Sequence, residues 1–224
     1  MKTVVLTIDG QKIEAPEGEK LLWVALDNGI YIPNLCAIRE ASHPAAACRL
    51  CFVEVEGKDN PVTACTEPVK AGMVVNTQGP KALRLARTAA ELIIASHPVD
   101  CANCPTRGSC ELVKIASHLK VKLKTKRLRK LVRDLPVDSS SPVFNYDPNK
   151  CVLCGRCVWV CRERFGIGDI SFAHRGFQRV VSTFNDEPMV QARCAVCCEC
   201  VTVCPVGAFY FKDTEEARKI CEQK

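Results

Sequence analysis

Several marks of common protein classes are missing from this sequence. No apolar run approaches the about 20 residues of a membrane-spanning helix, so we expect no transmembrane segment. Met1 to Gly10 alternates polar and apolar residues and lacks the basic segment and apolar stretch of a signal peptide, so we expect no secretion signal. Because no G-x-G-x-x-G or other phosphate loop occurs, nicotinamide and flavin are expected to bind elsewhere.

Cysteine, by contrast, is abundant, with 17 among 224 residues. In a chain without a secretion signal, so many thiols indicate a reducing compartment where cysteine binds metal instead of pairing, which favours a cytoplasmic location. The hydrophobic share of 47% includes these cysteines, so the aliphatic and aromatic core is thinner than that figure suggests. We therefore expect two or three α+β domains whose folding energy comes partly from bound metal.

Two stretches near the C-terminus repeat one cysteine pattern. Cys151 to Cys161 and Cys194 to Cys204 both read C-x2-C-x2-C-x3-C, the spacing that surrounds a [4Fe-4S] cluster with thiolates. A zinc module would instead place two C-x2-C pairs, or a cysteine and a histidine pair, far apart. Because the fourth cysteine of such a run binds the other cluster in two-cluster ferredoxins, we expect two crossed ligand sets. The sets are Cys151, Cys154, Cys157 and Cys204, and Cys194, Cys197, Cys200 and Cys161.

The residues around these motifs resemble a bacterial-type ferredoxin domain, expected over residues 141–224. Phe144 to Lys150 is similar to its first strand and Gly207 to Phe211 to its closing strand. One departure is Cys198, which stands where the second motif usually has glycine. Cys198 and Cys221 fall outside both ligand sets, and we expect free thiols, although Cys198 could compete as a ligand.

The N-terminal part, residues 1–78, has the pattern of a small sheet with one helix. Lys2 to Ile8 and Gln11 to Ala15 predict two strands joined by an Asp9-Gly10 hairpin turn. Glu19 to Asn28 has apolar residues at helical spacing. Further strands are expected at Phe52 to Val55, Pro61 to Cys65 and Met73 to Val75. Strand, hairpin, strand and helix are the opening of a β-grasp fold.

Four cysteines in this part can hold a two-iron cluster: Cys36, Cys48, Cys51 and Cys65. The pattern resembles the plant-type [2Fe-2S] ferredoxin, except that its first gap is eleven residues instead of four. The longer gap is similar to the form at the start of the large iron-sulfur subunit of complex I and its hydrogenase relatives. A structural zinc held by four cysteines is the alternative.

Residues 79–119 place a histidine beside three cysteines. Lys81 to Ile94 has one apolar helical face and leads into His97, Cys101, Cys104 and Cys110, an H-x3-C-x2-C-x5-C arrangement. It resembles the [4Fe-4S] cluster of the same family that is bound by one histidine and three cysteines, in a small helical domain. His43, His118 and His174 match no such pattern, and we expect them to be ordinary packed or solvated residues.

Residues 120–140 form a basic connector with eight lysines and arginines and no acid between Lys120 and Arg133. Without aromatic stacking residues or a known binding fold, we expect a solvated face or a docking surface for an acidic partner, and no nucleic acid. The net charge of +6 counts cysteines as neutral. About fifteen thiolates and four cluster cores of about +2 each would bring the loaded protein near −1.

Across nearly the whole chain, the order of these sites resembles the diaphorase iron-sulfur small subunit of NAD-linked [NiFe] hydrogenases. It is also similar to the N-terminal third of the complex I large iron-sulfur subunit and to the front of multi-cluster [FeFe] hydrogenases. The resemblance implies one [2Fe-2S] and three [4Fe-4S] clusters in a non-catalytic subunit between a flavin/NAD(H) subunit and a hydrogenase catalytic subunit. The same relay in a formate dehydrogenase, a bifurcating or a complex I-like assembly, and a free-standing polyferredoxin, are the alternatives.

Overall fold

The computed structural model describes residues 2–124, 127–191, 197–215 and 217. Its contacts divide the chain into two compact units, one of residues 1–93 and 113–125 and the other of residues 94–112 and 126–224. Segment 79–119, expected as a domain of its own, contributes residues to both units. The boundaries at residues 78, 119 and 140 therefore remain predictions.

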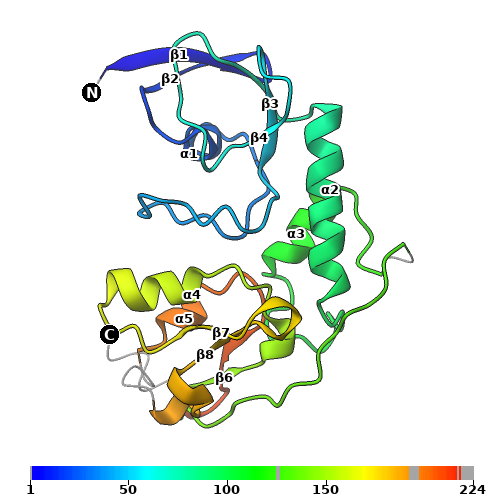
Figure 1. Cartoon of the computed structure of the whole chain (residues 1–224), viewed down its shortest axis with the longest axis vertical. Coiled ribbons are helices and arrows are strands. Elements are labelled where there is room, and N and C mark those ends of the chain that lie inside the picture. Colours follow the sequence, from blue (N-terminus) through cyan, green and yellow to red (C-terminus); the bar gives the residue numbers. More distant parts are fainter. Residues whose placement is uncertain (1, 125–126, 192–196, 216, 218–224) are drawn as a thin grey trace. The chain divides into compact units, whose positions relative to one another are not determined.

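The first unit contains a mixed five-stranded sheet in the order β2-β1-β5-β3-β4. Figure 1 labels four of these strands, β1 to β4. Strand β1 pairs antiparallel with β2 and parallel with β5, which in turn pairs antiparallel with β3. The strands are β1 Thr3–Ile8, β2 Gln11–Pro16, β3 Phe52–Val55, β4 Val62–Thr63 and β5 Val74–Asn76. Asp9 and Gly10 have φ values of 50° and 84°, as a two-residue hairpin turn requires. The predicted hairpin and the α+β fold are confirmed.

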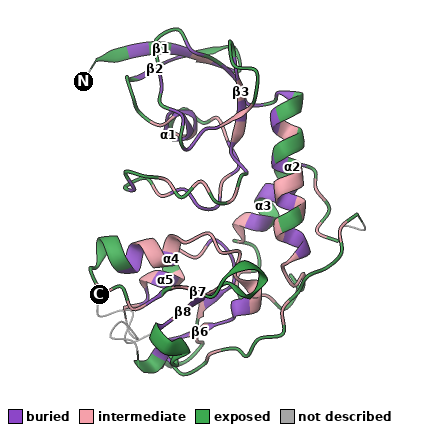
Figure 2. Cartoon of the chain, viewed as in Figure 1, coloured by how far each residue is buried: buried purple, intermediate pink, exposed green. Residues whose placement is uncertain are grey.

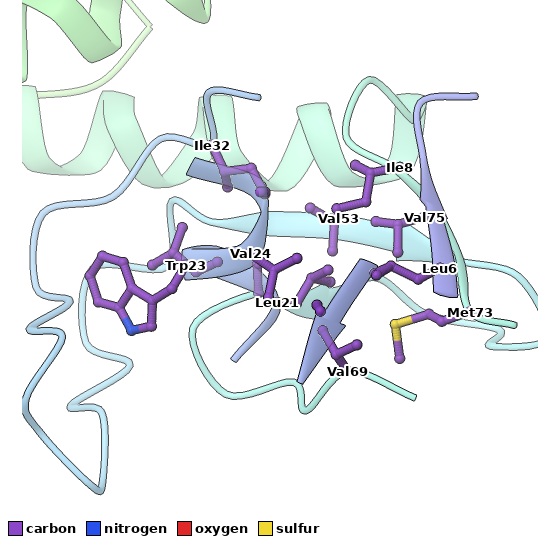
Figure 3. Close-up of a cluster of buried hydrophobic side chains, with 14 of the residues drawn as sticks. Leu6, Ile8, Leu21, Trp23, Val24, Ile32, Val53, Val69, Met73 and Val75 are labelled. Carbon is purple, nitrogen blue, oxygen red and sulfur yellow. The ribbon is translucent and has the colours of Figure 1, made fainter. Parts of the chain in front are cut away.

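Helix α1, Leu21–Asp27, completes the core of this unit. Figure 3 shows Leu21 and Val24 of α1 gathered with Leu6, Val53 and Val75 of the sheet, all of them buried. The helix begins two residues later than Glu19, where the sequence pattern placed it, because Lys20 has an extended backbone and forms a β-bridge with Pro68.

Helix α2, Pro80–Ala95, matches the predicted helix to within one residue at each end, and α3, Glu111–His118, follows it. The Glu54 carboxylate on β3 accepts from the backbone N–H groups of Lys81 (2.8 Å) and Ala82 (3.1 Å) at the start of α2. A Cβ atom at Gly79 would lie 2.2 Å from the Glu54 Cδ atom. Glycine at this position therefore leaves room for a carboxylate that caps the helix.

The second unit contains two small antiparallel sheets, one of β6 with β9 and one of β7 with β8. Strands β6, Phe144–Tyr146, and β9, Phe209–Phe211, are the first and closing strands that the sequence predicted. Strands β7, Ser171–Ala173, and β8, Val180–Ser182, were not predicted. Buried aromatic rings join β6 to β9, with Tyr146 stacked on Phe209 at 4.4 Å between ring centroids.

Short helices and turns make up much of the rest of this unit. They are α4 Arg156–Trp159, α5 Glu199–Thr202, the π-helical turn η2 Val160–Arg164, and the 3-10 turns η1 Pro148–Lys150, η3 Gly176–Gln178, η4 Phe184–Asp186 and η5 Met189–Gln191. Helices α4 and α5 lie inside the two repeated cysteine motifs. Each begins after a residue with positive φ, Gly155 (79°) or Cys198 (63°).

The connector is largely solvated over the residues that the structure describes (Figure 2). Lys122, Lys124, Arg129 and Lys130 are exposed. The apolar residues Leu131 and Val132 are also about half exposed. None of the helices in the described part of the chain is long and apolar enough to span a membrane.

Candidate iron-sulfur sites

The four N-terminal cysteines lie on the loop between α1 and β3 and on the turn after β4. Cys36, Cys51 and Cys65 are at most 3% exposed, and Cys48 is partly buried. The Sγ atoms of Cys36 and Cys48 are 3.4 Å apart, and the backbone N–H of Cys48 lies 3.5 Å from the Cys36 Sγ atom. The fold therefore brings thiols that are up to 29 positions apart in the sequence near one another, on this loop and this turn.

These thiols interact as two pairs. The hydrogen bond from Cys36 lowers the pKa of Cys48 to about 6, with help from the backbone amides of Leu35, Cys36 and Leu50. The same hydrogen bond and burial raise the pKa of Cys36. Cys51 and Cys65 behave likewise, with the pKa of Cys51 raised and that of Cys65 lowered by their mutual hydrogen bond. Iron takes the place of such shared protons when it binds thiolates.

Backbone amides also point at the sulfur atoms of this loop. The Ala47 and Cys48 amides hydrogen-bond to the Cys36 sulfur. Ala46 and Arg49 have φ values of 47° and 54°, which turn the chain tightly around the thiols. Such hydrogen bonds raise the reduction potential of a bound cluster.

His97 lies just after α2, and its imidazole is suited to metal binding. Burial lowers its pKa, against an opposing hydrogen bond with the Lys150 backbone, so the ring is neutral at pH 7. Its Nδ1 atom is buried, and no described residue forms a hydrogen bond with it. A neutral ring with one nitrogen held by the backbone and the other unengaged is the form in which histidine coordinates a metal.

The three cysteines that follow His97 lie on an irregular loop that ends at α3. Cys101 is exposed, and Cys104 and Cys110 are partly buried. The Thr106 hydroxyl lies 3.4 Å from the Cys104 Sγ atom. The backbone N–H of Glu111, the first residue of α3, donates to the Pro205 carbonyl at 3.0 Å. This contact ties the loop to the turn after Cys204.

One small cavity in the second unit is lined by all four cysteines of the first crossed set: Cys151, Cys154, Cys157 and Cys204. Burial raises the pKa of Cys151 to about 11 and of Cys154 to about 12, and raises the pKa of Cys157 strongly. Thiolates at this depth are unfavourable unless the positive charge of iron compensates them. The Leu153 N–H lies 3.4 Å from the Cys151 Sγ atom, at a residue with φ of 54°.

A second small cavity is lined by Cys161, Cys197, Cys198 and Cys200, with Ile167 and Ile170 beside them. Cys161 comes from the first motif and the other three from the second motif, as the crossed grouping expects. Cys194, the fourth member of this set, and Cys221 lie outside the described residues. Cys198 is buried in the left-handed conformation that Gly155 adopts in the first motif, so it faces the same cavity as the expected ligands.

The remaining histidines and the largest of the cavities described lie apart from the expected cluster ligands. Among the described residues, the cysteines included, no group of three or more His, Cys, Asp or Glu side chains is placed to hold a single metal ion. His43 is exposed, His118 contacts the Tyr31 ring at 4.8 Å, and His174 pairs with Asp186 at 3.1 Å. A cavity of about 990 Å³ beside the connector is lined by residues such as Arg133 and Phe177 and contains no cysteine.

Thr106 and Gly207 are site residues that the cysteine spacing did not reveal. Thr106 lies two positions after Cys104, which is the only sequence hint of its contact with the sulfur. Gly207 was expected only as the start of a strand. Its approach to Cys104 joins segments about a hundred residues apart, and no local pattern encodes such a contact.

Three family models match the chain in order. The 2Fe-2S iron-sulfur cluster binding domain matches residues 1–80, and the NADH-ubiquinone oxidoreductase-G iron-sulfur binding region matches residues 87–124. The ferredoxin-like domain of NADH-quinone oxidoreductase subunit 3 matches residues 141–210. These matches confirm cluster-binding domains of both the 2Fe-2S and the 4Fe-4S kind.

Sequence similarity to characterised proteins extends over nearly the whole chain. The NADPH-Fe(3+) oxidoreductase subunit alpha of Geobacter sulfurreducens is 37% identical over 93% of this chain. The NADP-reducing hydrogenase subunit HndD of Solidesulfovibrio fructosivorans is 34% identical over 93% of it. The chain spans only 24% and 36% of the lengths of these two relatives.

A solved structure shares the fold. A chain of an NAD+-reducing [NiFe]-hydrogenase in the H2-reduced state superimposes with a TM-score of 0.83 and 28% identity, covering 94% of this chain and 88% of that one. The order of domains, the cysteine loops and these similarities lead to one conclusion. The chain is an iron-sulfur electron-transport protein that resembles the N-terminal part of the large iron-sulfur subunit of complex I.

Proposed function

We propose that this protein is a non-catalytic relay that passes electrons between a flavin/NAD(H)-binding subunit and a hydrogenase catalytic subunit. The relay consists of one [2Fe-2S] and three [4Fe-4S] clusters, which supply one-electron redox chemistry when bound. The observation that carries the proposal is that Cys151, Cys154, Cys157 and Cys204 line one small cavity, while Cys161, Cys197 and Cys200 line another. The similarity to a chain of an NAD+-reducing [NiFe]-hydrogenase supports the choice of partners.

The residues assigned to each cluster are those that the sequence predicted. Cys36, Cys48, Cys51 and Cys65 would hold the two-iron cluster, and His97, Cys101, Cys104 and Cys110 would hold the first four-iron cluster. The crossed sets in the second unit would hold the other two. The protein would supply the thiolates and the imidazole, and in the Cys36 and Cys151 groups it also directs backbone amides at the sulfurs.

Most of the protein's own contribution is to hold the ligands rigidly. Turns of positive φ at Ala46, Arg49, Leu153 and Gly155 bend the backbone around the sulfurs. Apolar side chains such as Val206, Phe209 and Ile170 line the two cavities beside the cysteines. An electron relay needs cluster sites that change little in structure when an electron arrives and that water reaches poorly.

A second candidate is the same relay in a complex I-like assembly or in an oxidoreductase with another terminal acceptor. The 37% identity to a subunit of an NADPH-Fe(3+) oxidoreductase favours this candidate, as does the 36% identity to an NADH-quinone oxidoreductase subunit of Streptomyces coelicolor. The two candidates differ in the partner and not in the clusters.

The experiment is to purify the tagged protein from its own organism, identify its companions, and add NADH while following the clusters by electron paramagnetic resonance (EPR). We expect a flavin-containing partner, a hydrogenase partner, and reduction of the clusters by NADH in the complex but not in the separated protein. A monomer without companions would instead support a free-standing polyferredoxin. The Cys36→Ala complex is the control, because it should lose the two-iron signal while keeping its companions.

A further inference from the structure

A hydroxyl group lies against one of the cysteines expected to bind the histidine-ligated cluster. The Thr106 Oγ1 atom is 3.4 Å from the Cys104 Sγ atom, and both side chains are partly buried. A cysteine that binds iron is a thiolate and can only accept hydrogen bonds, so the hydroxyl must be the donor when the cluster is present.

Gly207 leaves the space that this pair occupies. A Cβ atom at Gly207 would lie 2.9 Å from the Cys104 Sγ atom and 3.0 Å from the Thr106 Oγ1 atom. The φ angle of Gly207 lies outside the left-handed region that favours glycine. Close approach of the Cys104 and Thr106 side chains, and not backbone conformation, therefore explains glycine at this position.

The two segments are also joined by backbone contacts within the same compact unit. The Glu111 N–H donates to the Pro205 carbonyl at 3.0 Å, two residues before Gly207. Cys204, at the start of this turn, has its Sγ atom 2.7 Å from the Val206 carbonyl. The turn of residues 204–207 therefore lies against the loop that carries both Cys104 and Thr106.

We propose that Thr106 is a positioning residue that donates a hydrogen bond to the Cys104 thiolate, and that the lack of a side chain at Gly207 leaves the room that this contact needs. The bond raises the reduction potential of the cluster assigned to His97, Cys101, Cys104 and Cys110. Hydrogen bonds withdraw electron density from a ligand sulfur, which favours the more negative, reduced cluster. The inference rests on the proposed relay function, because it assumes that Cys104 binds iron.

The test is an EPR-monitored redox titration of iron-loaded Thr106→Val, which keeps the shape of threonine and removes its hydroxyl. We expect the midpoint potential of one four-iron signal to shift to more negative values while the other signals stay in place. Thr106→Ser keeps the hydroxyl and should leave the potential near that of the unmodified protein. Ser117→Ala is the control, because Ser117 is an exposed residue of α3, eleven positions after Thr106.

Gly207→Ala gives a second measurement that does not alter either polar group. Its methyl group should push Thr106 and Cys104 apart and shift the same signal in the same direction. An unmoved potential in Thr106→Val at full iron content would overturn the inference while leaving the relay intact. Absence of that signal from the unmodified protein would instead contradict the assignment of Cys104 and the proposed function together.

Discussion

At the scale of single residues, His97 is the proposed ligand that would distinguish this chain from a protein with cysteine sites alone. Its neutral ring and buried Nδ1 atom fit metal coordination, and the Lys150 backbone holds it. An imidazole leaves the cluster less negative than a thiolate would, so it raises the reduction potential.

Replacing His97 by cysteine should therefore lower the potential of one four-iron EPR signal and leave the other clusters unchanged. His97→Ala should lose that signal and about four irons per chain. His118→Ala is the control, since His118 packs edge-on against Tyr31 at 4.8 Å. If no signal moves in His97→Cys, His97 is not a ligand.

The crossed grouping of cysteines can be tested with single substitutions. Cys204→Ala and Cys157→Ala should remove the same EPR signal, because both residues line the first small cavity. Cys161→Ala and Cys200→Ala should each remove a second EPR signal, because both residues line the other cavity. Loss of one common signal from Cys204→Ala and Cys200→Ala would show that the sets are not crossed.

At the scale of elements, the local sequence predicted those parts whose signals are strong. The Asp9-Gly10 turn has residues that accept positive φ, and α2 has a long apolar stripe, so both were predicted closely. The β7 and β8 strands have three residues each and are joined through a turn with positive φ at His174 and Gly176. Such short strands have no alternation to detect, and they form only because the two segments pair.

In the candidate sites, too, features with a local sequence pattern could be predicted, and contacts between distant segments could not. Cysteine spacing, together with the crossing of two-cluster ferredoxins, predicted that Cys151, Cys154, Cys157 and Cys204 lie together, and these four residues line one cavity. Gly207 and Thr106 carry no such constraint, since their roles arise from a contact between distant segments. Cys198 could be predicted only in part. The sequence shows that cysteine replaces the usual glycine there, but it does not show that the side chain is buried beside the expected ligands.

The carboxylate of Glu54 should stabilise the start of α2. It accepts hydrogen bonds from two N–H groups that have no partner within the helix. Glu54→Ala should lower the free energy of unfolding by about 1 kcal/mol, measured as a lower urea midpoint of the iron-loaded protein. Glu56→Ala, at an exposed position two residues away, is the control and should leave the midpoint unchanged.

At the scale of the whole molecule, bound clusters would affect both the folding and the net charge of the protein. The cysteine-rich loops of both units have little regular structure, so bound iron would order them. Bound clusters would also bring the formal charge of +6 close to neutral, which removes the electrostatic reason to expect nucleic acid. The exposed basic residues of the connector remain suited to an acidic partner subunit.

The central claim is that these cysteines and His97 hold iron-sulfur clusters, and metal analysis tests it most directly. Iron, acid-labile sulfide and zinc should be measured on protein purified without oxygen. The account predicts about fourteen irons and about fourteen sulfides per chain, from one two-iron and three four-iron clusters, with little zinc. Zinc in place of iron, with no labile sulfide, would contradict it.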